Sequence, residues 1–304
     1  MRAMNMKFWG IFLSLVVLLA ACQEEKKENH FVTISGQFKN ATFDSVYVIL
    51  NEREKGFALD FDGNFSDTLQ LNDEGYKVLA IDREEIPVYL MAGDSLSINA
   101  DMQRFQQTFY YKGKGAERNN YLYEKDNLFT IWLANDHLYR LAPQDYLDNI
   151  TDFSMQLRQM MKAKDLEPAF QKVEQRNIYF DEFNMLYLYR DSYAYFNPTQ
   201  PQLPVDFLDF TRFDLNNEED FKQFRSYRNI ISYYFDEQLN RGVDPVAFFA
   251  TLKSEAIQIE FLRTLLQHLD PTETTAEADY RIFQQLCPYP SLLKEAKAKM
   301  EGKF

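Results

Sequence analysis

The period of the hydrophobic pattern changes at Gly115, and this change limits the possible folds more than any other feature of the chain. Before it, short runs rich in β-branched and aromatic residues alternate with turn residues, which is typical of strands. After it, apolar residues recur every three or four positions, which is typical of helices. The sequence therefore predicts an α+β protein with an antiparallel β-sandwich over residues 31–115 and an all-α helical domain over residues 116–304.

Turn residues separate the expected strands. Asp62-Gly63 lies between two alternating runs and predicts a hairpin, because glycine adopts the positive φ that the turn requires. A calcium loop at Asp60 is disfavoured, since Phe65 and Leu71 occupy the positions of the required glycine and glutamate. Gly113-Lys114-Gly115 is interpreted as a strand-to-helix connection rather than a phosphate cradle. The expected strands are 31–38, 45–50, 57–61, 64–71, 76–82, 86–91, 95–100 and 108–111.

Proline and glycine residues divide the helical part. An apolar stripe stops at Pro143, a second stripe follows it, and Pro168 fits only the first turn of a third helix. Asp244-Pro245 is a strong helix start, with a capping side chain followed by proline at the first helical position. We expect helices over 128–141, 147–161, 166–196, 219–239, 244–270, 276–286 and 291–300, with a loop over 199–217 that contains a short helix near Phe207.

The first 21 residues resemble a secretory signal peptide. Arg2 and Lys7 precede an apolar run that is too short to span a bilayer, since a spanning helix needs about 20 apolar residues. The run ends at Cys22 with the pattern of a bacterial lipobox, in which the cysteine is diacylated and becomes the first residue. An ordinary signal peptide with a coincidental cysteine is the alternative. The predicted lipobox residues are Leu19, Ala20 and Ala21, and the predicted lipidation site is Cys22.

Residues 22–30 are polar and charged, which predicts a lipidated tether. Its acidic residues also resemble a surface-export tag, and composition does not separate this from a plain spacer. The expected location is the cell envelope, with the outer membrane favoured and either a periplasmic or a surface-facing orientation. The chain carries a net charge of −13, so nucleic acid is excluded as an expected partner, and membrane attachment would depend on the lipid.

The chain shows no catalytic motif, and the sequence predicts no catalytic residue, cofactor or metal site. With Cys22 lipidated, Cys287 has no disulfide partner. Cys287-Pro288-Tyr289-Pro290 resembles a glutaredoxin turn without its second cysteine, and an interhelical turn is the favoured interpretation. His137 is interpreted as a surface residue, and His268 as a favourable charge at a helix C-terminus. The remaining candidates are Glu218-Glu219-Asp220, interpreted as a first helical turn, and the aromatic groups at 187–189 and 232–235, interpreted as core rather than a ligand groove.

A series of short motifs resembles one known family. They are the lipobox, Thr33-Ile34-Ser35-Gly36, 59–65, 88–96 and 112–122. In this order they are similar to the N-terminal region of the envelope-anchored TlpA-like thioredoxin lipoproteins. The resemblance implies a β-sandwich, a helical region and then a thioredoxin domain with a Cys-x-x-Cys site. This chain contains no Cys-x-x-Cys, so the redox activity of that family transfers to no residue here.

Two functions follow as hypotheses. The first is a non-catalytic envelope lipoprotein that acts as a binding or interaction module. The alternative is a truncated or split thiol-disulfide oxidoreductase, completed by a separate thioredoxin-like chain as its protein partner.

Overall fold

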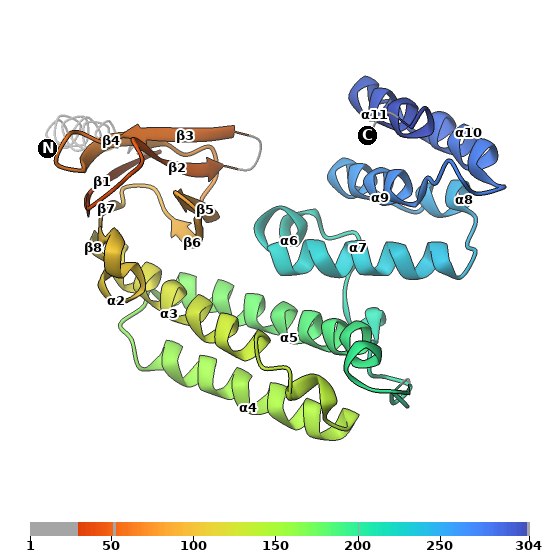
Figure 1. The fold of residues 1–304 in the computed structure, drawn as a ribbon, viewed down its shortest axis with the longest axis horizontal. Helices are drawn as coiled ribbons and strands as arrows, with labels where there is room; N and C mark the ends of the chain where they lie inside the picture. Colours follow the sequence, from red (N-terminus) through yellow and green to blue (C-terminus); the bar gives the residue numbers. More distant parts are fainter. Residues whose placement is uncertain (1–29, 51–52, 200, 303–304) are drawn as a thin grey trace, which may run out of the picture.

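The computed structural model describes residues 30–50, 53–199 and 201–302, and it shows an N-terminal β region followed by a helical region (Figure 1). This confirms the predicted fold class. Alternating side chains such as Val32, Ile34, Val46 and Val48 are fully buried between two four-stranded sheets. The strands are β1 (Phe31–Lys39), β2 (Ser45–Leu50), β3 (Arg53–Ala58), β4 (Asn64–Gln70), β5 (Gly75–Ile81), β6 (Glu84–Leu90), β7 (Ser95–Asp101) and β8 (Tyr110–Lys114).

One sheet has the order β4-β1-β7-β8 and the other has the order β3-β2-β5-β6. Strand β1 pairs with β7 in parallel, with Thr33 opposite Ser95, whereas every other described pair is antiparallel. The antiparallel prediction is therefore wrong for this pair. The physical reason is the long connection between β1 and β7. It contains β4 and the four strands of the other sheet, so the chain can return to β1 in the same direction.

The Asp62-Gly63 turn is present, but the predicted hairpin is wrong. Strand β3 pairs with β2 and β4 pairs with β1, so the turn carries the chain from one sheet to the other. Gly63 has the expected positive φ of 75°. The Asp60 carboxylate accepts the backbone N–H groups of Asp62 at 2.9 Å and Asn64 at 2.8 Å, which holds the turn together.

The longer helices begin at Ala116, directly after the sandwich, whereas two short helical segments lie between β7 and β8. Several predicted bounds are confirmed, among them the helix that ends before Asn197 and the helix over 276–286. The longer helices are α3 (Ala116–Leu133), α4 (Pro143–Lys162), α5 (Pro168–Phe196), α7 (Arg225–Asn240), α9 (Glu255–His268), α10 (Ala276–Leu286) and α11 (Pro290–Met300). The short ones are η1 (Met102–Arg104), α2 (Phe105–Thr108), η2 (Leu138–Arg140), η3 (Phe210–Arg212), α6 (Glu218–Gln223) and α8 (Pro245–Phe249).

The predicted helix over 128–141 is wrong: α3 begins at Ala116 and ends at Leu133, only η2 follows, and Pro143 begins α4. Two other helices that we expected to be continuous are each broken. The predicted helix over 219–239 splits into α6 and α7 at Phe224, whose backbone is extended and whose ring packs 5.2 Å from that of Phe180. The predicted helix over 244–270 splits into α8 and α9. Ser254 begins α9 by accepting the Ile257 N–H, so the second half of the apolar stripe starts a new helix with its own cap.

The helices form two groups around the sandwich (Figure 1). Helix α3 packs against β6 and β8 and continues into a group with α4 and α5, while α6 to α11 form a second stack beside it. Helix α6 and the start of α7 face β5 and β6, where the rings of Tyr76 and Phe224 lie 6.0 Å apart. In the described part of the chain, no helix combines the length and apolarity needed to cross a membrane.

Candidate functional site

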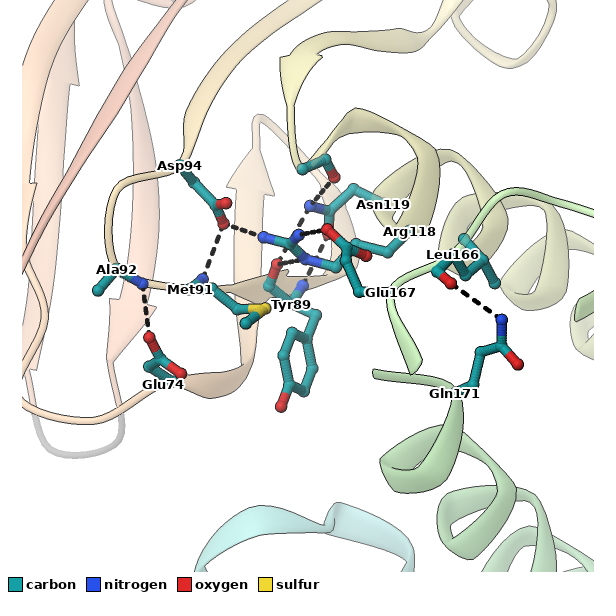
Figure 2. A network of polar contacts seen from close by, with 11 residues as sticks. Glu74, Tyr89, Met91, Ala92, Asp94, Arg118, Asn119, Leu166, Glu167 and Gln171 are labelled. Atoms are coloured by element: carbon teal, nitrogen blue, oxygen red, sulfur yellow. Dashed lines mark hydrogen bonds and ion pairs between the residues drawn. The ribbon is translucent and has the colours of Figure 1, made fainter. Parts of the chain in front are cut away.

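Helix α3 covers one edge strand of each sheet with two consecutive asparagines. The Asn119 amide accepts the Tyr89 N–H at 2.7 Å and donates to the Tyr89 carbonyl at 3.1 Å, as a neighbouring strand would (Figure 2). The Asn120 amide does the same to Tyr111, with distances of 2.8 and 3.0 Å. Tyr89 lies on β6 and Tyr111 on β8, which are edge strands of different sheets. Adjacent helical residues point in different directions, so two neighbours can reach two sheets.

Arg118 fixes the same end of α3 against the sandwich. Its buried guanidinium contacts the Asp94 carboxylate, donates to the Tyr89 carbonyl at 3.1 Å and donates to Glu167 at 2.6 Å (Figure 2). Gly115 starts the helix with a φ of 90°, and a Cβ there would lie 2.7 Å from the Arg118 guanidinium. The strand-to-helix interpretation of this glycine is therefore confirmed, and the motif serves to join the sandwich to the helices.

A buried charge cluster lies one to two turns further along α3. Glu174 is fully buried and accepts hydrogen bonds from Lys125 at 2.6 Å and from the Tyr121 hydroxyl at 3.1 Å. The Tyr76 hydroxyl also donates to Glu174, which links β5 to α5. Lys125 reaches Asp181 at 2.8 Å as well. These contacts tie β5, α3 and α5 together at the base of the space between the sandwich and α7.

The pKa values in this cluster follow from burial and from the two carboxylates. Burial alone would lower the pKa of Lys125, but Asp181 and Glu174 raise it above its ordinary value. Burial raises the pKa of Tyr76 well above its usual range, and the Glu174 charge adds to this effect. The lysine therefore stays charged and the phenol neutral at ordinary pH, so the cluster supplies fixed charge rather than a group ready to exchange a proton.

A cleft opens above this cluster. It consists of two adjoining cavities of about 540 and 720 Å³, which share the lining residues Lys77, Lys222 and Arg228. Cavities of this size accommodate small organic ligands or short peptide segments. The apolar lining comes from Ile49, Val78 and Pro87 on the strands and from Leu122, Phe129 and Leu133 on α3.

The helical wall of the cleft carries two arginines one turn apart on α7. Arg228 donates to the carbonyls of Phe221 at 3.0 Å and Lys222 at 3.2 Å, so its guanidinium is held at the end of α6. Burial lowers the pKa of Arg228 below its ordinary value, and the nearby charge of Arg225 acts in the same direction. Within the described chain, neither arginine forms an ion pair within 4.0 Å of a carboxylate.

The structure does not bring the residues that were considered from sequence into one site. Cys22 and the lipobox residues Leu19, Ala20 and Ala21 lie outside the described residues. Cys287 is buried, its thiol contacts the Tyr289 carbonyl at 3.6 Å, and burial raises its pKa. No group of three metal-ligating side chains occurs in the part of the chain that the structure describes.

The remaining residues considered from sequence are two histidines, an acidic triplet and two aromatic groups, and all of them lie in the described part of the chain. His137 is exposed, as predicted. His268 does lie in the last turn of α9, and its Nε2 also lies 2.9 Å from the Asp236 carboxylate, a contact that sequence reasoning missed. Glu218-Glu219-Asp220 forms the first turn of α6, as predicted, and Asp220 also accepts the Arg176 Nε–H at 2.7 Å. Tyr187, Tyr189 and Phe235 are buried, which confirms the core interpretation for these three rings.

Comparisons with protein-family models, with curated proteins and with solved structures found no match. The resemblance to the TlpA-like lipoproteins therefore stays a prediction. The candidate site is the cleft, defined by geometry and charge alone.

Proposed function

We propose that this chain is a lipid-anchored envelope protein that acts as a non-catalytic binding module and takes its ligand in the cleft between the sandwich and α7. The cleft itself is the observation that supports binding, since its apolar lining and charged wall are the usual features of a ligand site. The anchor rests on the sequence around Cys22.

Binding is favoured over thiol chemistry because of the surroundings of Cys287. An attacking cysteine needs an accessible thiol with a lowered pKa, whereas burial raises the pKa of this one. In a split oxidoreductase, the reactive thiols would therefore have to come from a separate thioredoxin-like chain.

A neutral fluorescent probe, N-phenyl-1-naphthylamine, tests the cleft. We expect saturable binding to the chain from Gln23 onward, and loss of that binding in Val78→Trp, which places an indole on the apolar lining. Val205→Trp is the matched control, because Val205 is fully exposed and does not line the cleft. Equal binding by both variants would show that the cleft is not the site.

Metabolic labelling with an alkyne fatty acid tests the anchor. We expect Cys22→Ala to lose the label and Cys287→Ala to keep it, because only the first removes the predicted acylation site. A Cys22→Ala chain that still incorporates label would contradict the lipobox prediction.

A further inference from the structure

We infer that the cleft selects organic anions that combine an apolar body with one acidic group, and that Arg225 and Arg228 bind the acidic group. This inference rests on the proposed binding function and adds the class of ligand to it.

The sign of the charge is the first argument. The chain as a whole carries a net charge of −13, yet five cations line the 540 Å³ cavity against three carboxylates, Glu85, Asp126 and Asp181. The cations are Lys77, Lys125, Lys222, Arg225 and Arg228. The lysines are paired with carboxylates of the protein: Lys77 with Asp73 at 2.5 Å, Lys125 with Glu174 and Asp181, and Lys222 with Glu218. The two arginines are the cleft cations that lack such a pair in the described chain.

The second argument is the way in which Arg228 is held. Both of its hydrogen bonds go to carbonyls at the end of α6, and these orient the guanidinium without neutralising it. Burial and the repulsion from Arg225 lower the pKa of Arg228, and the charge of Glu260, which acts in the opposite direction, does not cancel them. An anion placed between the two guanidinium groups would relieve this repulsion and gain charge-assisted hydrogen bonds.

The third argument concerns the rest of the ligand. Val78 and Pro87 lie opposite each other on β5 and β6, and together with Leu122 and Phe129 they form an apolar surface within the same cavity as the arginines. Asp126 and Glu85 also line this cavity, so a second negative group on the ligand would be repelled there. The arrangement therefore favours one acidic group attached to an apolar body over a small inorganic anion or a polyanion.

A pair of probes with the same aromatic body tests the inference. The anionic member is 8-anilinonaphthalene-1-sulfonate, and the neutral member is N-phenyl-1-naphthylamine, which lacks the sulfonate. We expect the sulfonate to bind the chain from Gln23 onward more tightly than the neutral probe does. The affinity for the sulfonate should also fall between 20 and 500 mM NaCl, because salt screens the arginines, while that for the neutral probe stays unchanged.

Substitution of the arginines locates the effect. Arg225→Gln should weaken sulfonate binding about tenfold, as expected for one charge-assisted hydrogen bond, and Arg225→Gln/Arg228→Gln should weaken it further. Neither variant should change binding of the neutral probe. Arg281→Gln/Lys294→Gln is the matched control, since it removes two positive charges from exposed positions on α10 and α11 that do not line the cleft.

The outcomes separate the inference from the proposed function. Equal affinities for the two probes, or sulfonate binding that the double arginine variant leaves unchanged, would overturn the anion preference while the cleft remains a binding site. Absence of saturable binding by either probe would overturn both. Arg225 is exposed and makes no hydrogen bond within the described chain, so Arg225→Gln should fold normally and keeps the test decisive if Arg228→Gln does not.

Discussion

The two asparagines at the start of α3 give the sharpest test of how the sandwich is joined to the helices. In Asn119→Ala the buried N–H of Tyr89 loses its acceptor, whereas the Tyr89 carbonyl keeps the Arg118 Nε–H. An orphaned buried donor costs about 1–3 kcal/mol, and the two hydrogen bonds that Asn119 donates add to this, so we expect a loss of about 2–4 kcal/mol of unfolding free energy. At ~2 °C per kcal/mol for a chain of this length, the melting temperature should fall by about 4–8 °C.

Amide hydrogen exchange distinguishes the roles of the two residues. Asn119→Ala should speed exchange at Tyr89 and leave Tyr111 protected, and Asn120→Ala should do the reverse, because each amide covers one strand. Asn149→Ala is the control, since Asn149 is exposed on α4 and should change stability by no more than ~0.5 kcal/mol. If Asn119→Ala melts like Asn149→Ala, or if both amides exchange faster in each variant, the asparagines do not act as separate covers for the two sheets.

Two further predictions concern buried polar groups. Lys125→Met should lower the unfolding free energy by about 3–5 kcal/mol in chemical denaturation, because it leaves the Glu174 and Asp181 carboxylates without their cation. Lys164→Met is the control: it removes a more exposed ion pair with Glu124 and should lower the unfolding free energy by less than ~1 kcal/mol. Equal losses of unfolding free energy in the two variants would contradict the reasoning that burial makes the Lys125 contacts the more important ones. Native Cys287 should react slowly with iodoacetamide at pH 8 and quickly in denaturant, because the thiol is buried and its pKa is raised. The chain from Gln23 onward should also show no dithiol-dependent reduction of insulin disulfides. Reduction that is lost in Cys287→Ser would show that this thiol is reactive.

The local pattern was sufficient to predict most elements of the fold. Pro168 and the change of period at Gly115 each act on their own neighbours, and the structure begins helices at Pro168 and directly after Gly115. The pairing of β4 with β1 was not predictable in this way, because a turn signal does not say which sheet the next strand joins. The breaks at Phe224 and before Ser254 were hidden by apolar spacing that stays helical across them. Ser254 itself was a usable signal, since serine favours the N-cap position.

The candidate site was harder to foresee, although part of its signal lies in the sequence. Glu174 occurs four residues after Phe170 and four before Ile178, so it lies on the core face of a predicted helix. Lys125 lies three residues after Leu122 and four before Phe129, so it also lies on an apolar helix face. Charged residues on an apolar face indicate a buried ion cluster. The cleft above it depends on how α7 sits against β5 and β6, and no pattern within either segment contains that information.

The covering of β6 and β8 by Asn119 and Asn120 has a consequence for the order in which the protein can be made. Synthesis runs from the N-terminus, so strands β1 to β8 leave the ribosome before the two residues that cover the edges at β6 and β8. Until α3 follows, two rows of unpaired backbone groups remain open to other chains. A fragment that stops at Lys114 would keep that exposure permanently and should self-associate, so for folding the first turns of α3 belong to the sandwich.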